Sequence, residues 1–236
     1  MLKVVVLAAG IGTRLRPLTY YIPKSMLPLG GRPALEYIIE YLKKYNHREI
    51  VIALSYLADN VTNYFQDGER FGVKITYSIS ENPRGTAGEV YNAKELLGGP
   101  FVCYYGDIIT DLNLTKLTDY HKRKGGIATV ALVKNVPVEV GVATLNSDDT
   151  ITEFKEKPPL NMPVNTGIYV FQEKVVEYLD DRDQLDFGFH VFPKLIEAGE
   201  KIYGCVFEDA FWYDLGTLRR YEELEKLVKA EKIKLQ

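Results

Sequence analysis

Cysteine is scarce in this sequence: its 236 residues include two, Cys103 and Cys205. Both lie within apolar runs, PFVCYYG and KIYGCVF. Thiols in such runs are typical of buried, unpaired cysteines in a reducing compartment. We therefore predict two free thiols in the protein interior and a cytoplasmic location.

Long hydrophobic runs are absent as well. No stretch approaches the ~18 consecutive apolar residues that would span a membrane. The apolar run near the N-terminus is short and is followed at once by Arg14 and Arg16, so it predicts a strand rather than a signal peptide. The net charge is −3 and the pI about 5.7, which argues against the basic stripe of a nucleic-acid binder. We expect neither a membrane nor a nucleic acid as a partner.

Several common functional patterns are also missing. A dinucleotide-binding fingerprint requires a third glycine where Leu15 stands, and a P-loop requires a Gly-Lys-Ser/Thr sequence that the chain lacks. No Ser–His–Asp set or Cys–His pair is evident. The three histidines, His47, His121 and His190, occur in dissimilar settings. We predict that they lie at the surface or at helix ends, without a functional role.

What is present indicates an α/β protein. In the first half, β-branched apolar runs alternate with stretches of helical spacing, which indicates βαβ units and a largely parallel sheet. The expected strands there cover residues 4–8, 49–54, 73–79 and 101–105. The second half contains short strands, IATVALV, GVATL, TITEFKE and NTGIYVF, with fewer helices. We predict a Rossmann-like single domain over residues 1–236, with a mixed, mostly parallel sheet flanked by helices.

The segment LAAGIGTRLRPLT, residues 7–19, is the most informative one. A buried strand runs into Gly10 and Gly12, where the backbone can turn sharply and approach a ligand closely. Successive N–H groups in such a turn form a nest for anions. Arg14 adds a guanidinium fork that suits phosphate oxygens, and Lys24 supplies a second cation. The pattern predicts a phosphate-binding loop.

Two aspartates follow strand-like segments. Asp107 comes just after FVCYYG, at the carboxyl end of an expected strand, where open α/β sheets place ligands. Asp214 follows the aromatic stretch FWY. Two carboxylates with phosphate oxygens and waters make a typical Mg²⁺ site. For Asp111 and Asp209 we predict turn or capping roles instead.

The motifs together resemble a known family. G-x-G-T-R-x-x-P-x-T followed by P-K is similar to the signature of the sugar-1-phosphate nucleotidylyltransferases. The segments ENPRGTAGE, YYGDI, FKEKP, NTGIYVF and WYDLGT resemble the later motifs of that family, in the same order. The resemblance covers the chain from residue 4 to about residue 217.

The resemblance implies an activity. A nucleotidyl group would pass from a nucleoside triphosphate to a hexose 1-phosphate, with Mg²⁺ as cofactor and pyrophosphate as by-product. It implies a nucleotide-binding half up to about residue 125 and a sugar-phosphate-binding half from about residue 126. The partners would be the two substrates, and the chain would act as a monomer or a homodimer.

The resemblance also implies roles for residues by position. Nucleotide contacts would come from Leu7, Ala9, Gly10, Gly12, Thr13, Arg14, Glu81 and Gly85. Sugar-phosphate contacts would come from Gly141, Glu156, Lys157 and Asn165. The catalytic residues would be Arg14, Lys24 and Asp107, and the metal ligands Asp107 and Asp214.

Glu156 and Lys157 are neighbours in the sequence, so they can bind the same ligand only with a particular backbone conformation. On a regular strand they would point to opposite faces. Both reach one ligand only if this segment leaves the pleat, which Pro158 and Pro159 favour.

The base and the sugar remain open at this point. Glu81 stands where the family reads the base, and a carboxylate accepts both adjacent donors of guanine. This favours GTP and mannose 1-phosphate, and so GDP-mannose. The alternatives are dTDP-glucose or UDP-glucose synthesis, or a cytidylyltransferase for a polyol or inositol phosphate. From a different class, the alternative is a sugar-nucleotide sensor or regulatory subunit.

Overall fold

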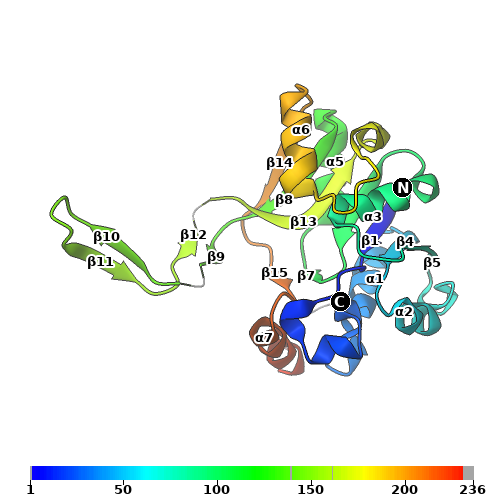
Figure 1. Cartoon of the computed structure of the whole chain (residues 1–236), viewed down its shortest axis with the longest axis horizontal. Coiled ribbons are helices and arrows are strands. Elements are labelled where there is room, and N and C mark those ends of the chain that lie inside the picture. Colours follow the sequence, from blue (N-terminus) through cyan, green and yellow to red (C-terminus); the bar gives the residue numbers. More distant parts are fainter. Residues whose placement is uncertain (1, 139, 161, 231–236) are drawn as a thin grey trace.

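A computed structural model describes residues 2–138, 140–160 and 162–230 (Figure 1). Its centre is a seven-stranded sheet in the order β14-β8-β13-β6-β1-β4-β5. The strands are β1 (Lys3–Leu7), β4 (Glu49–Leu54), β5 (Lys74–Ile79), β6 (Phe101–Tyr105), β8 (Ala128–Val133), β13 (Val164–Phe171) and β14 (Ile202–Phe207). Strand β13 runs antiparallel to both of its neighbours, and the remaining pairs are parallel. The predicted mixed, mostly parallel sheet is confirmed.

Helices cover both faces of this sheet, which is why its central strands are apolar throughout. In β1, Val4 and Val6 face one hydrophobic core and Val5 faces the other. The first core is closed by α1 (Ala34–Lys44), α2 (Ala58–Phe65), α5 (Leu114–Lys124) and α7 (Leu218–Lys229). The second is closed by α3 (Thr86–Asn92), α4 (Lys94–Leu97) and α6 (Phe192–Glu197).

Helix α5 is an element that the sequence pattern did not reveal. Its stretch LTKLTDYHKRK is polar, and its basic end resembles a solvated face. Two leucines, Leu114 and Leu117, nevertheless bury fully against the sheet. The side chain of Asn113 caps the helix by accepting a hydrogen bond from the N–H of Lys116, and Gly125 ends it in the left-handed conformation.

The histidines were predicted to lie at the surface or at helix ends, and two of them, His47 just after α1 and His121 in the last turn of α5, lie at helix ends but are buried. His47 is buried, and its Nδ1 lies 2.8 Å from the carbonyl oxygen of Leu2. His121 is buried in α5, with Nδ1 at 2.9 Å from the hydroxyl of Thr129. Burial lowers the pKa of both rings. Each ring links two parts of the fold through a hydrogen bond, and the residues next to a histidine in the sequence do not reveal such a partner.

The two cysteines are buried and unpaired, as predicted. Burial raises the pKa of the Cys103 thiol well above its ordinary value. Among the described residues, no helix combines the length and the apolar character that crossing a bilayer requires.

A two-stranded arm leaves the sheet where β8 and β13 continue beyond it (Figure 1). In the part of the arm nearest the sheet, β9 (Val136–Pro137) pairs with β12 (Pro159–Leu160). In its outer part, β10 (Val142–Leu145) pairs with β11 (Ile151–Lys155). Every residue of β10 and β11 is exposed. The arm therefore stands in solvent and is not part of either hydrophobic core.

Two further small sheets complete the fold. Strand β7 (Ile108–Thr110) pairs antiparallel with β15 (Trp212–Asp214), and β2 (Pro28–Leu29) pairs with β3 (Arg32–Pro33). A 3₁₀ segment, Glu173–Tyr178, and a π-helical turn, Phe187–Val191, lead into α6.

Candidate active site

A cavity of about 310 Å³ opens at the carboxyl ends of β1 and β6. Open α/β sheets bind ligands at this edge. Six of the residues singled out in the sequence line it: Leu7, Ala9, Gly10, Lys24, Gly85 and Asp107. Residues far apart in the sequence thus meet in one cleft.

The glycine loop reaches this cleft through a tight turn. Gly12 has a φ of 67°, and a Cβ there would come within 3.0 Å of the Thr19 methyl carbon. The hydroxyl of Thr19 donates to the carbonyl oxygen of Gly12 at 2.8 Å. The chain then enters a 3₁₀ turn, Thr13–Leu15, that buries Leu15 and leaves Thr13 and Arg14 exposed. Gly12, Thr13 and Arg14 are not among the residues that line the cavity; an Arg14 guanidinium nitrogen lies 3.6 Å from where a Cβ on Gly216 would be, close to Asp214.

Lys24 and Asp107 form an ion pair inside the cleft. Both side chains are mostly buried, with 17% and 22% of their surfaces exposed. Each lines the cavity. Lys24, which is predicted to contact phosphate, is thus paired with Asp107, which is predicted to bind a metal.

Asp214 is brought next to Asp107 by the β7–β15 ladder. Asp214 lies opposite Ile108, and the N–H of Leu215 donates to the carbonyl oxygen of Asp107 at 2.9 Å. The Asp214 carboxylate accepts from the N–H of Gly216 at 2.7 Å and forms an ion pair with Arg220 at 3.0 Å. The backbones of the two aspartates are therefore close, with Asp107 in the turn before β7 and Asp214 at the end of β15, and their binding of one ion stays a prediction.

The donor set fits Mg²⁺. Within the described ranges no group of three or more His, Cys, Asp or Glu side chains gathers to hold a metal on its own. Mg²⁺ is commonly bound through one or two carboxylates together with substrate phosphates and waters. Asp107 and Asp214 supply two such carboxylates, and each is balanced by a cation, Lys24 or Arg220.

The far wall of the cleft comes from a segment that the sequence motifs did not reveal. Asp186 lines the cavity and accepts hydrogen bonds at 3.0 Å from both the N–H and the hydroxyl of Thr86, at the start of α3. The carbonyl oxygen of Leu185 accepts from the N–H groups of the next two helix residues. A Cβ on Gly85 would meet that carbonyl oxygen at 2.6 Å. Gly85 therefore permits a close backbone contact that closes the cleft.

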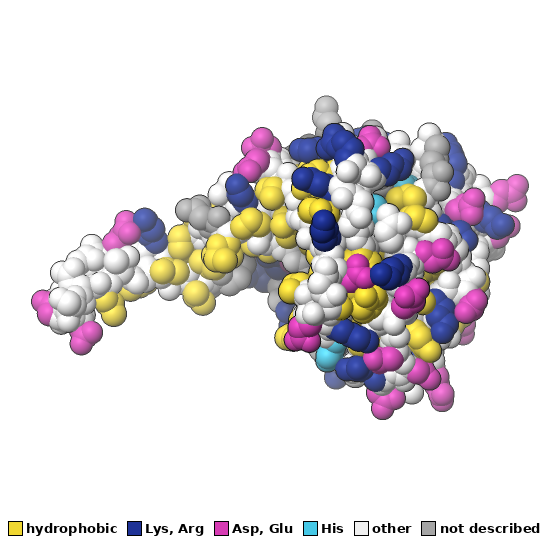
Figure 2. Space-filling view, turned by 90° about the horizontal axis from the view of Figure 1, so that it is seen from above, with side chains coloured by type: hydrophobic (Ala, Val, Ile, Leu, Met, Phe, Trp, Pro, Cys, Tyr) yellow, Lys and Arg dark blue, Asp and Glu magenta, His cyan; other side chains and the backbone are white. Residues whose placement is uncertain are grey.

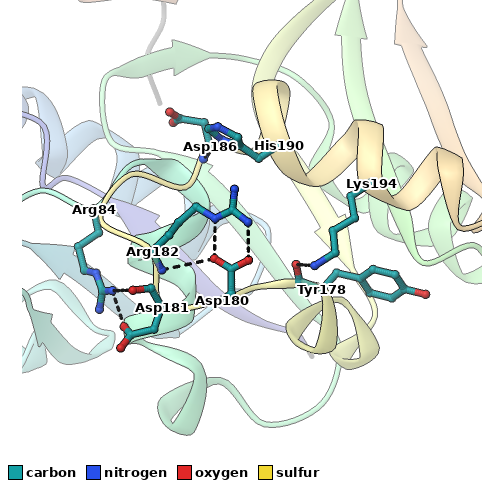
Figure 3. Close-up of polar contacts among 8 residues, drawn as sticks. All are labelled: Arg84, Tyr178, Asp180, Asp181, Arg182, Asp186, His190 and Lys194. Atoms are coloured by element: carbon teal, nitrogen blue, oxygen red, sulfur yellow. Dashed lines mark hydrogen bonds and ion pairs between the residues drawn. The ribbon is translucent and has the colours of Figure 1, made fainter.

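Polar contacts hold this wall in place (Figure 3). Arg84 forms an ion pair with Asp181 and donates to its carbonyl oxygen at 3.1 Å. The N–H of Asp186 donates to Nδ1 of His190 at 3.0 Å. The segment 178–194 is thereby tied to the start of α3, although about a hundred residues separate them in the sequence.

The buried carboxylate on the α3 side of the cleft belongs to Glu89. Its side chain accepts from the hydroxyl of Ser80 at 3.0 Å and from the N–H of Arg84 at 2.9 Å. Burial raises the pKa of this carboxyl, although both hydrogen bonds oppose the shift. Glu81 lies beyond the end of β5, is exposed, and is not among the lining residues. The geometry does not bring Glu81 to the cleft, and its role in reading the base stays a prediction.

The residues expected to bind the sugar phosphate are dispersed. None of the four is among the described residues that line the cavity. Asn165 comes nearest: its side-chain amide donates to the Tyr169 hydroxyl at 2.8 Å, which donates to the Tyr105 hydroxyl at 3.2 Å. Tyr105 lines the cavity. Asn165 is thus linked to the cleft through two tyrosines.

The other three lie on the arm. A Cβ on Gly141 would be 2.6 Å from the ring of Phe154 and 3.0 Å from the carboxylate of Glu156, so these residues share one face. Lys157 has a φ of 48°, so the chain leaves the regular pleat there, as its sequence context predicted. Its side chain lines a second cavity of about 360 Å³, together with Trp212 of β15.

Comparisons with known proteins agree with this architecture. The family model described as "Nucleotidyl transferase" matches residues 3–231. A UTP–glucose-1-phosphate uridylyltransferase of Synechocystis sp. is 36% identical over 99% of this chain and 65% of its own length. A mannose-1-phosphate guanylyltransferase of Mycobacterium tuberculosis is 33% identical over 90% of this chain and 60% of its own length. The chain thus spans slightly less than two thirds of the length of these curated relatives.

Solved structures show the same fold. HddC from Yersinia pseudotuberculosis superposes with a TM-score of 0.77 at 26% identity, covering 96% of this chain and 99% of its own. A further structure of HddC is a complex with GMP-PN and has the same TM-score.

Proposed function

Because this chain belongs to the nucleotidyl transferase family, we propose that it transfers a nucleotidyl group from a nucleoside triphosphate to a hexose 1-phosphate and releases pyrophosphate. The observation that carries the proposal is the cleft at the ends of β1 and β6. It brings Gly10, Lys24 and Asp107 together, with Asp214 beside Asp107.

Nucleotidyl transfer requires that phosphate charge is neutralised and that the two substrates are aligned. An oxygen of the sugar phosphate attacks the α-phosphorus, the bond from that phosphorus to the bridging oxygen breaks, and pyrophosphate leaves with the electron pair. The nucleophile is already an anion near neutral pH, and the leaving group is stable as one. Neither a general base nor a general acid is essential, so alignment and charge neutralisation carry the catalysis.

The residues of the cleft suit these needs. The backbone around Gly10 and Gly12 would receive the triphosphate, and the exposed guanidinium of Arg14 would neutralise its outer charge. Lys24 lines the cleft and would contact the α-phosphate. Asp107 and Asp214 would hold Mg²⁺, which supplies positive charge to phosphate oxygens when it is bound.

The preferred substrates in this proposal are GTP and mannose 1-phosphate. Relatives named mannose-1-phosphate guanylyltransferases, such as that of Mycobacterium tuberculosis, support them, and so does the HddC complex with GMP-PN. The second candidate is UTP with glucose 1-phosphate, because the uridylyltransferase of Synechocystis sp. is 36% identical. The two buried free thiols suit the reducing cytoplasm.

The test is a matrix of five nucleoside triphosphates against several sugar 1-phosphates, with pyrophosphate release as the readout and Mg²⁺ present. We expect turnover for a small set of pairs, with GTP and mannose 1-phosphate the fastest. A maximum with UTP and glucose 1-phosphate would select the second candidate. Tight binding of sugar nucleotides without any pyrophosphate release would indicate a sugar-nucleotide sensor instead of an enzyme.

A further inference from the structure

Asp186 brings a negative charge without a cationic partner to the cleft. It lines the cavity and is half-buried there. In the part of the chain that the structure describes it forms no ion pair, whereas Asp107, which also lines the cavity, is paired with Lys24. Figure 3 shows the Asp186 carboxylate apart from the arginines of the same wall, whose contacts run to other aspartates. The charge of Asp186 is therefore not used in holding the wall together.

The carboxylate of Asp186 is oriented through one of its two oxygens. Its Oδ1 accepts from the N–H and from the hydroxyl of Thr86, each at 3.0 Å. The backbone is fixed as well, because the N–H of Asp186 donates to Nδ1 of His190 at 3.0 Å. Within the described ranges, no hydrogen bond reaches Oδ2. A carboxylate accepts at both oxygens, so Asp186 is held in place by the protein and keeps one oxygen for a ligand.

A carboxylate in this position restricts which part of a ligand can lie against it. Phosphate oxygens carry negative charge and would be repelled. A neutral group that donates hydrogen bonds would be attracted. The hydroxyl groups of a hexose are donors of this kind. Ribose hydroxyls and the N–H groups of a base are the competing donors, so the place of Asp186 in the cleft decides between them.

Asp186 lies toward the β6–β13 side of the cleft. Burial raises the pKa of Tyr169, in β13, to about 12, and the nearby charge of Asp186 adds to that rise. The hydroxyl of Tyr169 donates to that of Tyr105, which follows in the wall of the same cavity. It also accepts from the side-chain amide of Asn165 at 2.8 Å. Asp186 is therefore close to the tyrosine that contacts Asn165, the one residue of the implied sugar site that belongs to the body of the chain.

The other residues implied in sugar binding are on the arm, which stands out from the body (Figure 2). We propose that Asp186 is a specificity-determining residue of the cleft, whose Oδ2 accepts hydrogen bonds from hydroxyl groups of the hexose 1-phosphate. The contact is set in advance, because Thr86 and His190 fix Asp186 without a ligand. This inference rests on the proposed function, since it concerns how the sugar of that reaction is recognised.

Steady-state kinetics test the contact. Asp186→Asn keeps the size of the side chain and an oxygen for Thr86 but removes the charge. We expect the KM for the sugar phosphate to rise about tenfold or more, with the KM for the triphosphate and the Tm nearly unchanged. Asp183→Asn is the matched control, because Asp183 is exposed on the same segment and does not line the cavity. A rise in the triphosphate KM instead, or equal effects of the two variants, would overturn the proposal.

Deoxy sugars separate a direct contact from a structural role. In a series of sugar 1-phosphates that each lack one hydroxyl, the analogue without the hydroxyl bound by Asp186 should lose about tenfold in kcat/KM with the wild type. With Asp186→Asn the same deletion should cost almost nothing, because the partner of that hydroxyl is already gone. If every analogue shows the same relative loss with both proteins, Asp186 has a structural role only and the proposal fails.

The proposed function and this contact fail in different ways. A wild type that releases no pyrophosphate with any substrate pair removes the proposed reaction. Calorimetric titration with GDP-mannose and UDP-glucose then still decides the contact. Binding to Asp186→Asn that is about tenfold weaker than binding to the wild type and to Asp183→Asn would support it. Equal binding to all three proteins, or no binding to the wild type, would rule it out.

Discussion

Arg220 forms an ion pair with the carboxylate of Asp214 at 3.0 Å, from the first turn of α7. Its guanidinium also stacks over the ring of Tyr213, with 4.5 Å to the centroid. Asp107 has the same kind of partner in Lys24. Both carboxylates suited to a metal are thus neutralised by a side chain of the protein, and a metal ion has to compete with these cations.

Replacing Arg220 should therefore favour the metal. In Arg220→Gln the carboxylate of Asp214 loses its charged partner, and we expect Mn²⁺ or Mg²⁺ to bind about tenfold more tightly in calorimetric titrations without substrate. Arg219→Gln is the matched control, since Arg219 pairs with Glu223 instead. Equal metal affinity in the two variants would contradict a competing role for Arg220.

Removing either metal carboxylate should cripple turnover. Asp107→Asn and Asp214→Asn are each expected to lower kcat on the order of 100-fold or more, because several kcal/mol of charge stabilisation is lost. Chelator should abolish wild-type activity, and added Mg²⁺ should restore it. The exposed Asp209→Asn serves as the control and should retain full activity. Turnover that persists in excess chelator would rule out the shared ion.

Arg14 and Lys24, the two cations proposed to contact phosphate, should affect the rate of catalysis rather than folding. Arg14→Ala and Lys24→Ala are expected to slow turnover by about 100- to 1000-fold, since each neutralises charge that develops on the phosphates. Arg16→Ala is the control, because that guanidinium stacks over Tyr20, 4.9 Å from the ring centroid. Thermal unfolding of all three should stay close to that of the wild type. Full activity in Arg14→Ala and Lys24→Ala would remove them from catalysis.

The sugar side should show a selective effect on binding. Lys157→Ala is expected to raise the KM for the sugar phosphate about tenfold and to leave the KM for the triphosphate nearly unchanged, since one charge-assisted hydrogen bond is lost. Lys155→Ala is the control, because Lys155 pairs with Glu153 at 2.8 Å. An equal rise in both KM values would argue against a sugar-phosphate contact.

Glu89 should make stability depend on pH. Burial raises the pKa of its carboxyl above the ordinary value of 4.5. The folded state thus holds this proton more tightly than the unfolded state, so the stabilisation is complete below 4.5 and is lost as pH rises through the folded-state pKa. In Glu89→Gln this loss is absent. The difference in Tm between the variant and the wild type should therefore grow in favour of the variant across that window; a constant difference would refute the assignment.

Much of the local structure could be predicted because it depends on neighbouring residues. The apolar run of β1, the helical spacing after Pro33 and the turn at Gly12 each express a short-range preference of the chain. Strands β4 and β6 begin and end at the predicted residues. The departure of Lys157 from the pleat likewise follows from the adjacent prolines.

Tertiary structure alone decided which side chains share the cleft. Ser80 and Glu81 are neighbours just beyond β5, yet Ser80 is buried and Glu81 is exposed, and the buried carboxylate comes from Glu89 instead. Asp186 joins the wall only because its segment closes on the start of α3. The sequence alone determined the elements and the chemistry of the motifs, because those depend on local geometry and residue type. The contents of the cleft and the outward course of the arm depend on long-range strand pairing, which local patterns do not encode.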